Sequence, residues 1–167
     1  MNRCHGEMIV LCIALSVVSQ AHAGRILYVD QKHARANDDN TGTQSSPWLT
    51  IAQRLSVVQP GDTLYIKGGT SRTDPNAIYD LSGHHGIDPV TPGTSGHVIT
   101  IQGYASDTVV VKGDSTQWTY GINLPSASYY AIRGIIFDNF HFGASGTGTK
   151  TDILVVPWLM RKKKVAA

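Results

Sequence analysis

The sequence predicts a small all-β protein built from short strands. The chain has 167 residues, of which 41% are hydrophobic and 16% charged, and this fits one ordinary domain. Its apolar segments are short, follow a period of two and often end at glycine. Helical patterns do not alternate with these segments, so the sequence does not fit repeated βαβ units. The scarcity of charge also excludes a coiled coil, and the hydrophobic content argues against disorder.

Charge is distributed unevenly along the chain. The formal net charge is +2, but four basic residues lie together at Arg161 to Lys164. Between Gly24 and Met160 there are nine Lys and Arg against eleven Asp, so this part is slightly acidic. Binding to nucleic acid needs clustered cations, and we therefore expect no nucleic-acid partner. We interpret the basic tail as a solvated chain end.

The first 23 residues have the pattern of a secretory signal peptide. Met8 to Val18 is an apolar stretch that is too short to span a bilayer, and the A-x-A sequence Ala21-His22-Ala23 follows it. Arg3 supplies a positive charge upstream. We expect cleavage after Ala23, a secreted protein (extracellular or periplasmic), and no membrane association after cleavage.

Both cysteines lie inside this leader. Cys4 and Cys12 would be removed with it, so the mature chain from Gly24 would carry no thiol. We therefore expect a protein of an oxidising compartment without disulfides, whose stability comes from a packed core. Zinc sites built on cysteine are excluded as well.

The mature chain starts with a strand, a polar loop and one predicted helix. Arg25–Asp30 is a short β-rich run, and residues 31–46 have the composition of a loop. Ser46 suits an N-cap and Pro47 the first helical position. The apolar residues of the next segment follow a helical spacing: Trp48, Ile51, Leu55 and Val58. Pro60-Gly61-Asp62 would end this helix.

The rest of the mature chain reads as short strands. The candidates are Thr63–Lys67, His97–Gln102, Thr108–Lys112, Tyr130–Arg133 and Ile135–Phe142. Two architectures fit them, an antiparallel sandwich and a parallel β-helix. Matching runs recur at about ten residues or less, so two strands per turn would give a coil of roughly twenty residues. One amphipathic helix ahead of the strands would cover the open end of such a solenoid.

Three groups of residues carry a resemblance to a known superfamily. The first is Gly42-Thr43 with Pro47-Trp48-x-Thr50-Ile51 and Pro60-Gly61-Asp62-Thr63-Leu64-Tyr65-Ile66. The second is Gly93-Thr94-x-Gly96-x-Val98-Ile99-Thr100-Ile101-x-Gly103-Tyr104, and the third is Tyr130-x-Ile132-Arg133-Gly134-Ile135-x-Phe137-x-Asn139. Together they resemble the N-terminal part of right-handed parallel β-helix proteins of the pectate-lyase-like superfamily. The resemblance covers about Ile26 to Phe142 and implies a few coils behind an N-terminal capping α-helix.

The resemblance implies a secreted, carbohydrate-active protein. Many members are polysaccharide lyases that cleave uronate-containing polymers such as pectate or alginate by β-elimination. Ca²⁺ held by Asp and Glu neutralises the uronate carboxylate, and a Lys or Arg removes the α proton. The expected partner is therefore an acidic polysaccharide and the expected cofactor Ca²⁺. We expect a monomer.

Four residues are the candidates for this chemistry. Arg133 follows the inward Ile132 of a strand, so it should face solvent and suits a carboxylate clamp or catalytic role. Asp138 is the candidate calcium ligand, although one carboxylate supplies few of the oxygens that Ca²⁺ requires. Trp118 and Tyr120 are the candidate platforms for sugar rings. We interpret the adjacent His84 and His85 as part of a solvated loop.

The end of the chain departs from the superfamily pattern. We divide the chain into residues 1–23 (leader), 24–142 (cap and first coils) and 143–167, a Gly/Thr-rich linker with an irregular basic tail. Because segment 143–167 lacks a glycine-punctuated coil, we favour a truncated or frame-shifted relative of a longer enzyme over a small protein capped by Ile153–Met160. The leading function is then a lyase-like protein that can be inactive. The alternative is a non-catalytic carbohydrate-binding or surface-structural module.

Overall fold

The computed structural model shows a mostly β protein with parallel sheets. It describes residues 23–146 except for 53, 116–118 and 125–128. The strands are β1 (Ile26–Val29), β2 (Thr63–Ile66), β3 (Ile78–Asp80), β4 (Ile99–Gly103), β5 (Val109–Lys112), β6 (Tyr120–Leu124), β7 (Tyr130–Arg133), β8 (Ile135–Asp138) and β9 (Phe142–Gly146). Two 3₁₀ turns, η1 (Leu55–Val57) and η2 (Pro75–Ala77), accompany them.

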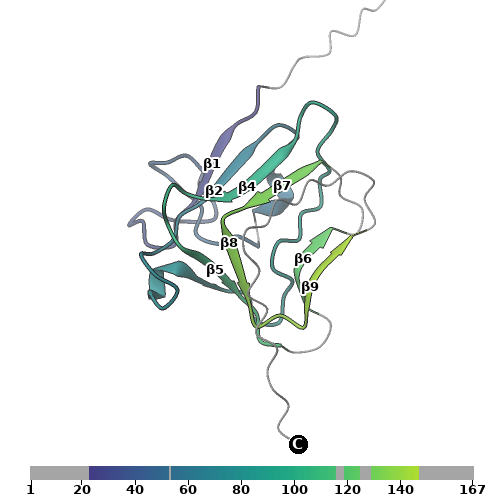
Figure 1. Ribbon diagram of the computed structural model, residues 1–167. Helices are drawn as coiled ribbons and strands as arrows, with labels where there is room; N and C mark the ends of the chain where they lie inside the picture. Colours follow the sequence, from purple (N-terminus) through teal and green to yellow (C-terminus); the bar gives the residue numbers. More distant parts are fainter. Residues whose placement is uncertain (1–22, 53, 116–118, 125–128, 147–167) are drawn as a thin grey trace, which may run out of the picture.

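The strands form three sheets that the chain visits in a repeating order. The sheets have the orders β1-β2-β4-β7, β3-β5-β8 and β6-β9, and every strand pair in them is parallel. From β4 onward the chain passes through the first, second and third sheet and then repeats this sequence, as Figure 1 shows. Parallel pairing rules out the antiparallel sandwich as the arrangement of these strands.

Pairing residues are farther apart in the sequence than expected. Ile26 pairs with Thr63, 37 positions later, and Ile99 pairs with Tyr130, 31 positions later. The spacing falls to 22 between Tyr120 and Phe142. The expectation of two strands and roughly twenty residues per turn was wrong, because from β4 onward the chain crosses three sheets in each turn. The sequence did not predict β3 and β6 as strands, and the predicted run Ile135–Phe142 is divided between β8 and the first residue of β9.

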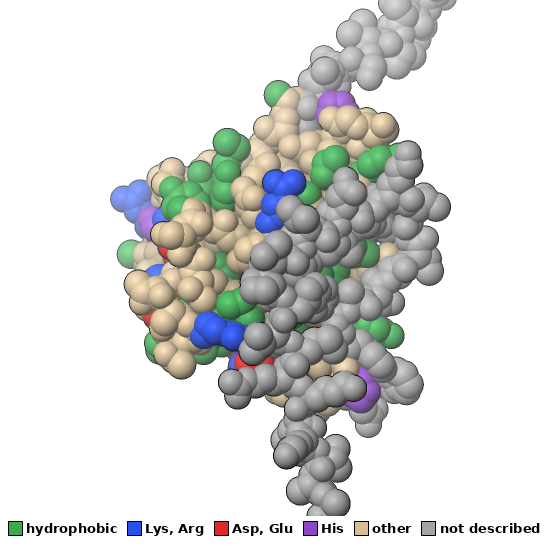
Figure 2. Space-filling model, in the orientation of Figure 1, with side chains coloured by type: hydrophobic (Ala, Val, Ile, Leu, Met, Phe, Trp, Pro, Cys, Tyr) green, Lys and Arg blue, Asp and Glu red, His purple; other side chains and the backbone are tan. Residues whose placement is uncertain are grey.

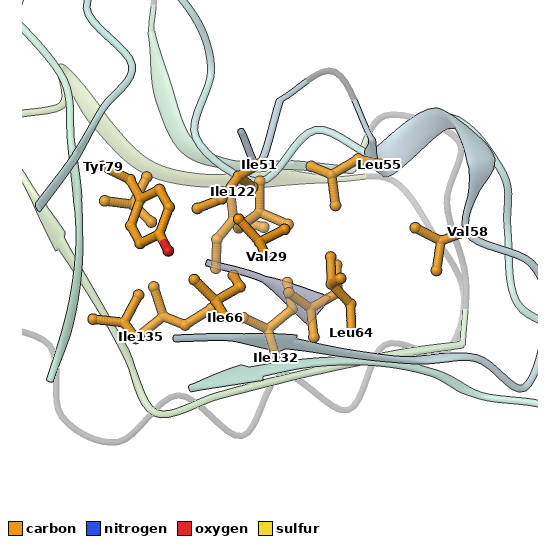
Figure 3. Close-up of a cluster of buried hydrophobic side chains, with 14 of the residues drawn as sticks. Val29, Ile51, Leu55, Val58, Leu64, Ile66, Tyr79, Ile122, Ile132 and Ile135 are labelled. Carbon is orange, nitrogen blue, oxygen red and sulfur yellow. The ribbon is translucent and has the colours of Figure 1, made fainter. Parts of the chain in front are cut away.

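The core lies between the sheets. In the first sheet the register aligns Leu27, Leu64, Ile101 and Ile132 across the four strands, and each of these side chains is buried. Figure 3 shows side chains from different strands converging on one cluster, with Ile122 of β6 and Tyr79 of β3 among them. Parallel sheets normally bury such apolar rows, and this row fixes which side chains point outward.

The capping segment is not the predicted α-helix. Trp48 forms a parallel bridge with Val29, its N–H donates to the Tyr28 carbonyl, and its carbonyl accepts the Asp30 N–H. That carbonyl is therefore not the acceptor of an i+4 helical bond. The carboxylate of Asp38 accepts the next two backbone N–H groups, those of Leu49 and Thr50. Within the described residues the segment keeps only the 3₁₀ turn η1.

The apolar stripe of this segment nevertheless packs as predicted. Its four members are buried: Trp48, Ile51, Leu55 and Val58. Gly42 lies so close that an added Cβ would approach the Trp48 ring to 2.7 Å, at a φ of +77° that favours glycine. Segment 42–48 thus covers the free edge of β1, the role expected of a helix, through Gly42 and Trp48 on either side of a turn at Thr43–Ser46.

One buried carboxylate fastens the start of β1 to the start of β2. Asp62 is fully buried and accepts hydrogen bonds from the guanidinium of Arg25 and from the backbone N–H groups of Arg25 and Gln59. Burial raises the pKa of Asp62, but these hydrogen bonds outweigh it and hold the pKa below its usual value of 3.8.

Candidate functional site

The outward face of the four-stranded sheet carries a row of polar and aromatic side chains. The register aligns Tyr28, Tyr65, Gln102 and Arg133 at one position on β1, β2, β4 and β7. Each follows a buried residue of the apolar row, so strand alternation turns these side chains away from the core. Neighbouring members are one strand spacing apart, about 4.8 Å.

Three tyrosines cluster at the β1 side of this row. The rings of Tyr28 and Tyr65 are stacked with centroids 5.6 Å apart, and Tyr104 meets them edge-on at 5.9 and 5.6 Å. All three side chains are half-buried. Their hydroxyl groups have no hydrogen-bond partner among the described residues. The cluster therefore offers aromatic surface and three phenolic groups to a ligand.

A pocket of about 570 Å³ lies beside Tyr104, where the strands of this sheet end. Its lining includes Asp30 after β1, Lys67 after β2, and Asp107, with His33 and Lys32 from the loop that follows β1. The Asp107 carboxylate accepts the Gly68 N–H at 2.9 Å, which fixes one wall. Strand ends and short loops therefore build this pocket together with the tyrosine cluster.

The charge of Lys67 is largely neutralised. Its Nζ lies 3.3 Å from Asp30 Oδ2 and 5.3 Å from the centre of the Tyr104 ring. The Lys67 carbonyl accepts the Tyr79 hydroxyl at 2.6 Å. Burial raises the pKa of Tyr79 above its usual value, so this phenol remains a donor. Lys67 is thus held in place and paired, which leaves it less available to an anionic ligand.

Arg133, by contrast, is exposed at the end of β7. Ile132 before it is buried, so the predicted outward direction of Arg133 is confirmed. Among the described residues the Arg133 guanidinium has no ion-pair or hydrogen-bond partner. A guanidinium offers five N–H donors in a planar fork and no acceptor. Arg133 therefore suits a carboxylate clamp better than a general base.

The other predicted site residues do not join this face. Tyr120 begins β6, in another sheet, and its ring lies 5.4 Å from that of His85. Asp138 ends β8 and is the register partner of Lys112 on β5. Trp118 lies outside the described residues, so its place is not described. The structure thus separates Arg133, Tyr120 and Asp138 onto three sheets.

Asp138 stays a predicted calcium ligand. Its register partner on β5 is Lys112, and Ca²⁺ takes six to eight oxygens, of which one carboxylate supplies two at most. The part of the chain that the structure describes contains no group of three or more His, Cys, Asp or Glu able to hold a metal.

The tyrosine cluster was missed from the sequence, although a signal exists. Arg25–Asp30 and Asp62–Lys67 share the pattern charge-x-Leu-Tyr-apolar-charge, and the structure sets these segments side by side. This likeness predicts that Tyr28 and Tyr65 are neighbours once parallel pairing is known. Tyr104 contacts them from the turn after β4, and only the three-dimensional structure reveals this contact.

Positive charge is not clustered on the side of the molecule drawn in Figure 2. The described Lys and Arg side chains visible there are scattered among apolar and uncharged groups. Within the described ranges, no helix is long and apolar enough to cross a membrane.

The fold and site define a mostly β protein with parallel sheets and an aromatic outer face that ends in Arg133, which has no ion-pair partner in the part of the chain that the structure describes. No family model matches the chain. Over 93 residues, 56% of the chain, it is 30% identical to the uncharacterized protein YwoF of Bacillus subtilis (strain 168). The chain spans 17% of the length of that protein.

Proposed function

We propose that the described residues form the first turns of a right-handed parallel β-helix of a secreted protein. The repeated visits to three parallel sheets support this architecture. Connections between parallel strands of one sheet are right-handed in about 98% of cases, which supports the hand. The leader pattern of residues 1–23 supports secretion.

We further propose that the outward face of the β1-β2-β4-β7 sheet binds an acidic polysaccharide. One observation carries this function: Arg133, whose guanidinium has no partner among the described residues, lies in the same outward row as the stacked Tyr28 and Tyr65. A guanidinium can bind a uronate carboxylate through two parallel hydrogen bonds. The aromatic surface and hydroxyl groups of the tyrosines suit the C–H faces and hydroxyl groups of the adjoining sugar rings.

Binding by matched arginine variants tests the proposal. Arg133→Ala is expected to weaken binding to polygalacturonate or alginate about tenfold, because a charge-assisted hydrogen bond contributes about 1.5–3 kcal/mol. Arg72→Ala is the control, since Arg72 is also an exposed arginine without a partner among the described residues but lies in the loop before η2. Equal losses in both variants, or none in either, would contradict a specific site at Arg133.

Cleavage by β-elimination is a second proposal, which rests on the superfamily resemblance and on Arg133. In that reaction a base takes the proton α to the carboxylate, the bond to the glycosidic oxygen breaks, and an unsaturated uronate forms. Ultraviolet absorbance of that product, measured with and without added Ca²⁺, tests for it. Retained polymer binding without the product favours the binding module. If the chain neither binds the polymer, nor forms the unsaturated product, nor unfolds cooperatively, a non-functional truncated chain is favoured.

A further inference from the structure

A second recess lies away from the tyrosine cluster. Its volume is about 470 Å³, and no described residue lines both this recess and the pocket beside Tyr104. The described lining combines the capping segment, the loop between β3 and β4, and the residue before β6: Ala52, Leu55, His84, His85, Asp88 and Thr119. No Lys or Arg is among the lining residues that the structure describes. The recess therefore differs in charge from the face that carries Arg133.

The loop that lines this recess is held in place by β6. Gly86 and Ile87 donate their N–H groups to the carbonyls of Tyr120 and Gly121, each at 2.8 Å, and Ile87 forms a parallel bridge with Ile122. An added Cβ on Gly86 would approach the Gly121 carbonyl oxygen to 2.2 Å. Glycine at this position permits the close approach, and the side chains on either side of it are fixed by strand-like pairing.

His85 presents a hydrogen-bond donor of defined position. Its Nδ1 accepts the backbone N–H of Tyr120 at 3.1 Å. A neutral imidazole that accepts at Nδ1 carries its proton on Nε2, so the second nitrogen is a donor. The ring is half-buried and lies 5.4 Å from the ring of Tyr120.

Asp88 supplies the complementary acceptor. Its Oδ1 accepts the side-chain amide of Asn123 at 3.0 Å, which orients the carboxylate. Its Oδ2 has no partner among the described residues. A carboxylate in a recess whose described lining carries no Lys or Arg disfavours a carboxylated or phosphorylated ligand, because like charges repel.

We propose that this recess binds a single uncharged sugar ring. A sugar hydroxyl donates to Asp88 Oδ2, and a second sugar oxygen accepts from His85 Nε2–H. The apolar C–H face of the ring packs against Ala52 at the recess wall, an arrangement in which a few placed polar groups orient the ligand. The site is independent of the acidic-polysaccharide face and selects an uncharged sugar rather than an acidic one.

The test is a titration of the full chain, followed through the imidazole NMR signals of His85. The probes are methyl glycosides of glucose, galactose and mannose, and the matching uronates. We expect saturable His85 shifts with at least one neutral glycoside and at least tenfold weaker binding of its uronate. Asp88→Asn keeps the shape of the side chain and should weaken binding of the neutral glycoside about tenfold. It should also reduce the difference in affinity between the neutral glycoside and its uronate.

Two further variants separate this site from its surroundings. Ala52→Tyr places a bulky ring at the recess wall while His85 and Asp88 themselves are kept, and it should abolish the His85 shifts caused by the sugar. Arg133→Ala should leave them unchanged, whatever it does to polymer binding, so the two proposals fail separately. The proposal is overturned if no neutral glycoside shifts the imidazole signals of His85, or if the uronate binds as tightly as the neutral glycoside. It is also overturned if Zn²⁺ alone saturates the His85 signals with the stoichiometry of a metal site.

Discussion

The two faces of the β1-β2-β4-β7 sheet follow opposite rules. Inward, the aligned residues are Leu27, Leu64, Ile101 and Ile132, none more than 3% exposed. Outward, one residue farther along each strand, they are Tyr28, Tyr65, Gln102 and Arg133. The inner row repeats one chemistry at every strand, whereas the outer row changes from aromatic to amide to guanidinium.

This difference separates folding from recognition. An inner position must fill a closed space, and burial of a Leu or Ile side chain stabilises the fold by about 1.5–3 kcal/mol. An outer position has no such constraint and is free to vary along the sheet. The change of chemistry along the outer row is therefore the part of this sheet that can be specific for a ligand, and substitutions in the two rows should have separable effects.

Substitution in the inner row is expected to have the largest effect. Ile101→Ala removes a fully buried side chain between Leu64 and Ile132 and leaves a cavity. The free energy of unfolding should fall by about 2–5 kcal/mol. Chemical denaturation followed by circular dichroism measures it.

The matched control lies one residue away. Gln102→Ala alters the outer row of the same strand and should change the free energy of unfolding by no more than about 0.5 kcal/mol. If Gln102→Ala destabilised the protein as much as Ile101→Ala, the assignment of inner and outer faces would be wrong.

The buried charge at the start of β2 is the next largest case. Asp62→Asn keeps the shape but replaces a charged acceptor of Arg25 and Gln59 N–H groups by an amide, at an expected cost of about 1–3 kcal/mol. Because the folded-state pKa of Asp62 is lowered, its stabilising effect is complete above about pH 4 and is lost as the pH falls through the folded-state value.

Unfolding measured between neutral and strongly acid pH tests this dependence. The difference in unfolding free energy between the natural chain and Asp62→Asn should shrink as the pH falls below about 4. A difference that stays constant over this range would contradict the role of the ionised carboxylate. Asp80→Asn serves as a comparison, because hydrogen bonds from Ser82 lower the pKa of this exposed carboxyl.

The inner row was predictable from the sequence, whereas for the capping segment only the buried side chains were predictable and not the backbone conformation. Alternation identified most strands of the first sheet, since burial on one face leaves a period-two pattern. The stripe from Trp48 to Val58 predicted burial correctly and the helix wrongly. The spacing of apolar residues indicates which side chains are buried. The helix does not form because backbone hydrogen bonds join Trp48 to β1 and the Asp38 carboxylate accepts the Leu49 N–H, and these bonds join residues distant in the sequence.

The outer row was predictable only where local alternation sufficed. Arg133 could be turned outward because Ile132 beside it is apolar. The nearness of Tyr28 to Tyr65 depends on a register that joins residues 37 positions apart, and alternation within one strand does not give it. For the same reason the sequence grouped Tyr120 and Arg133, which the structure places in different sheets.

The smallest expected effect distinguishes the two contributions of the tyrosine cluster. Tyr65→Phe keeps the ring contacts with Tyr28 and Tyr104 and removes a hydroxyl that has no partner among the described residues, so binding to acidic polysaccharide should fall about two- to fivefold. Tyr65→Ala removes both contributions and should lower it about tenfold. Isothermal titration with the polymer measures both, and unfolding curves check that each variant is folded. If Phe lowers binding as much as Ala, the hydroxyl makes the contact; if neither variant changes binding, the outer row recognises the polymer through Arg133 without the aromatic cluster.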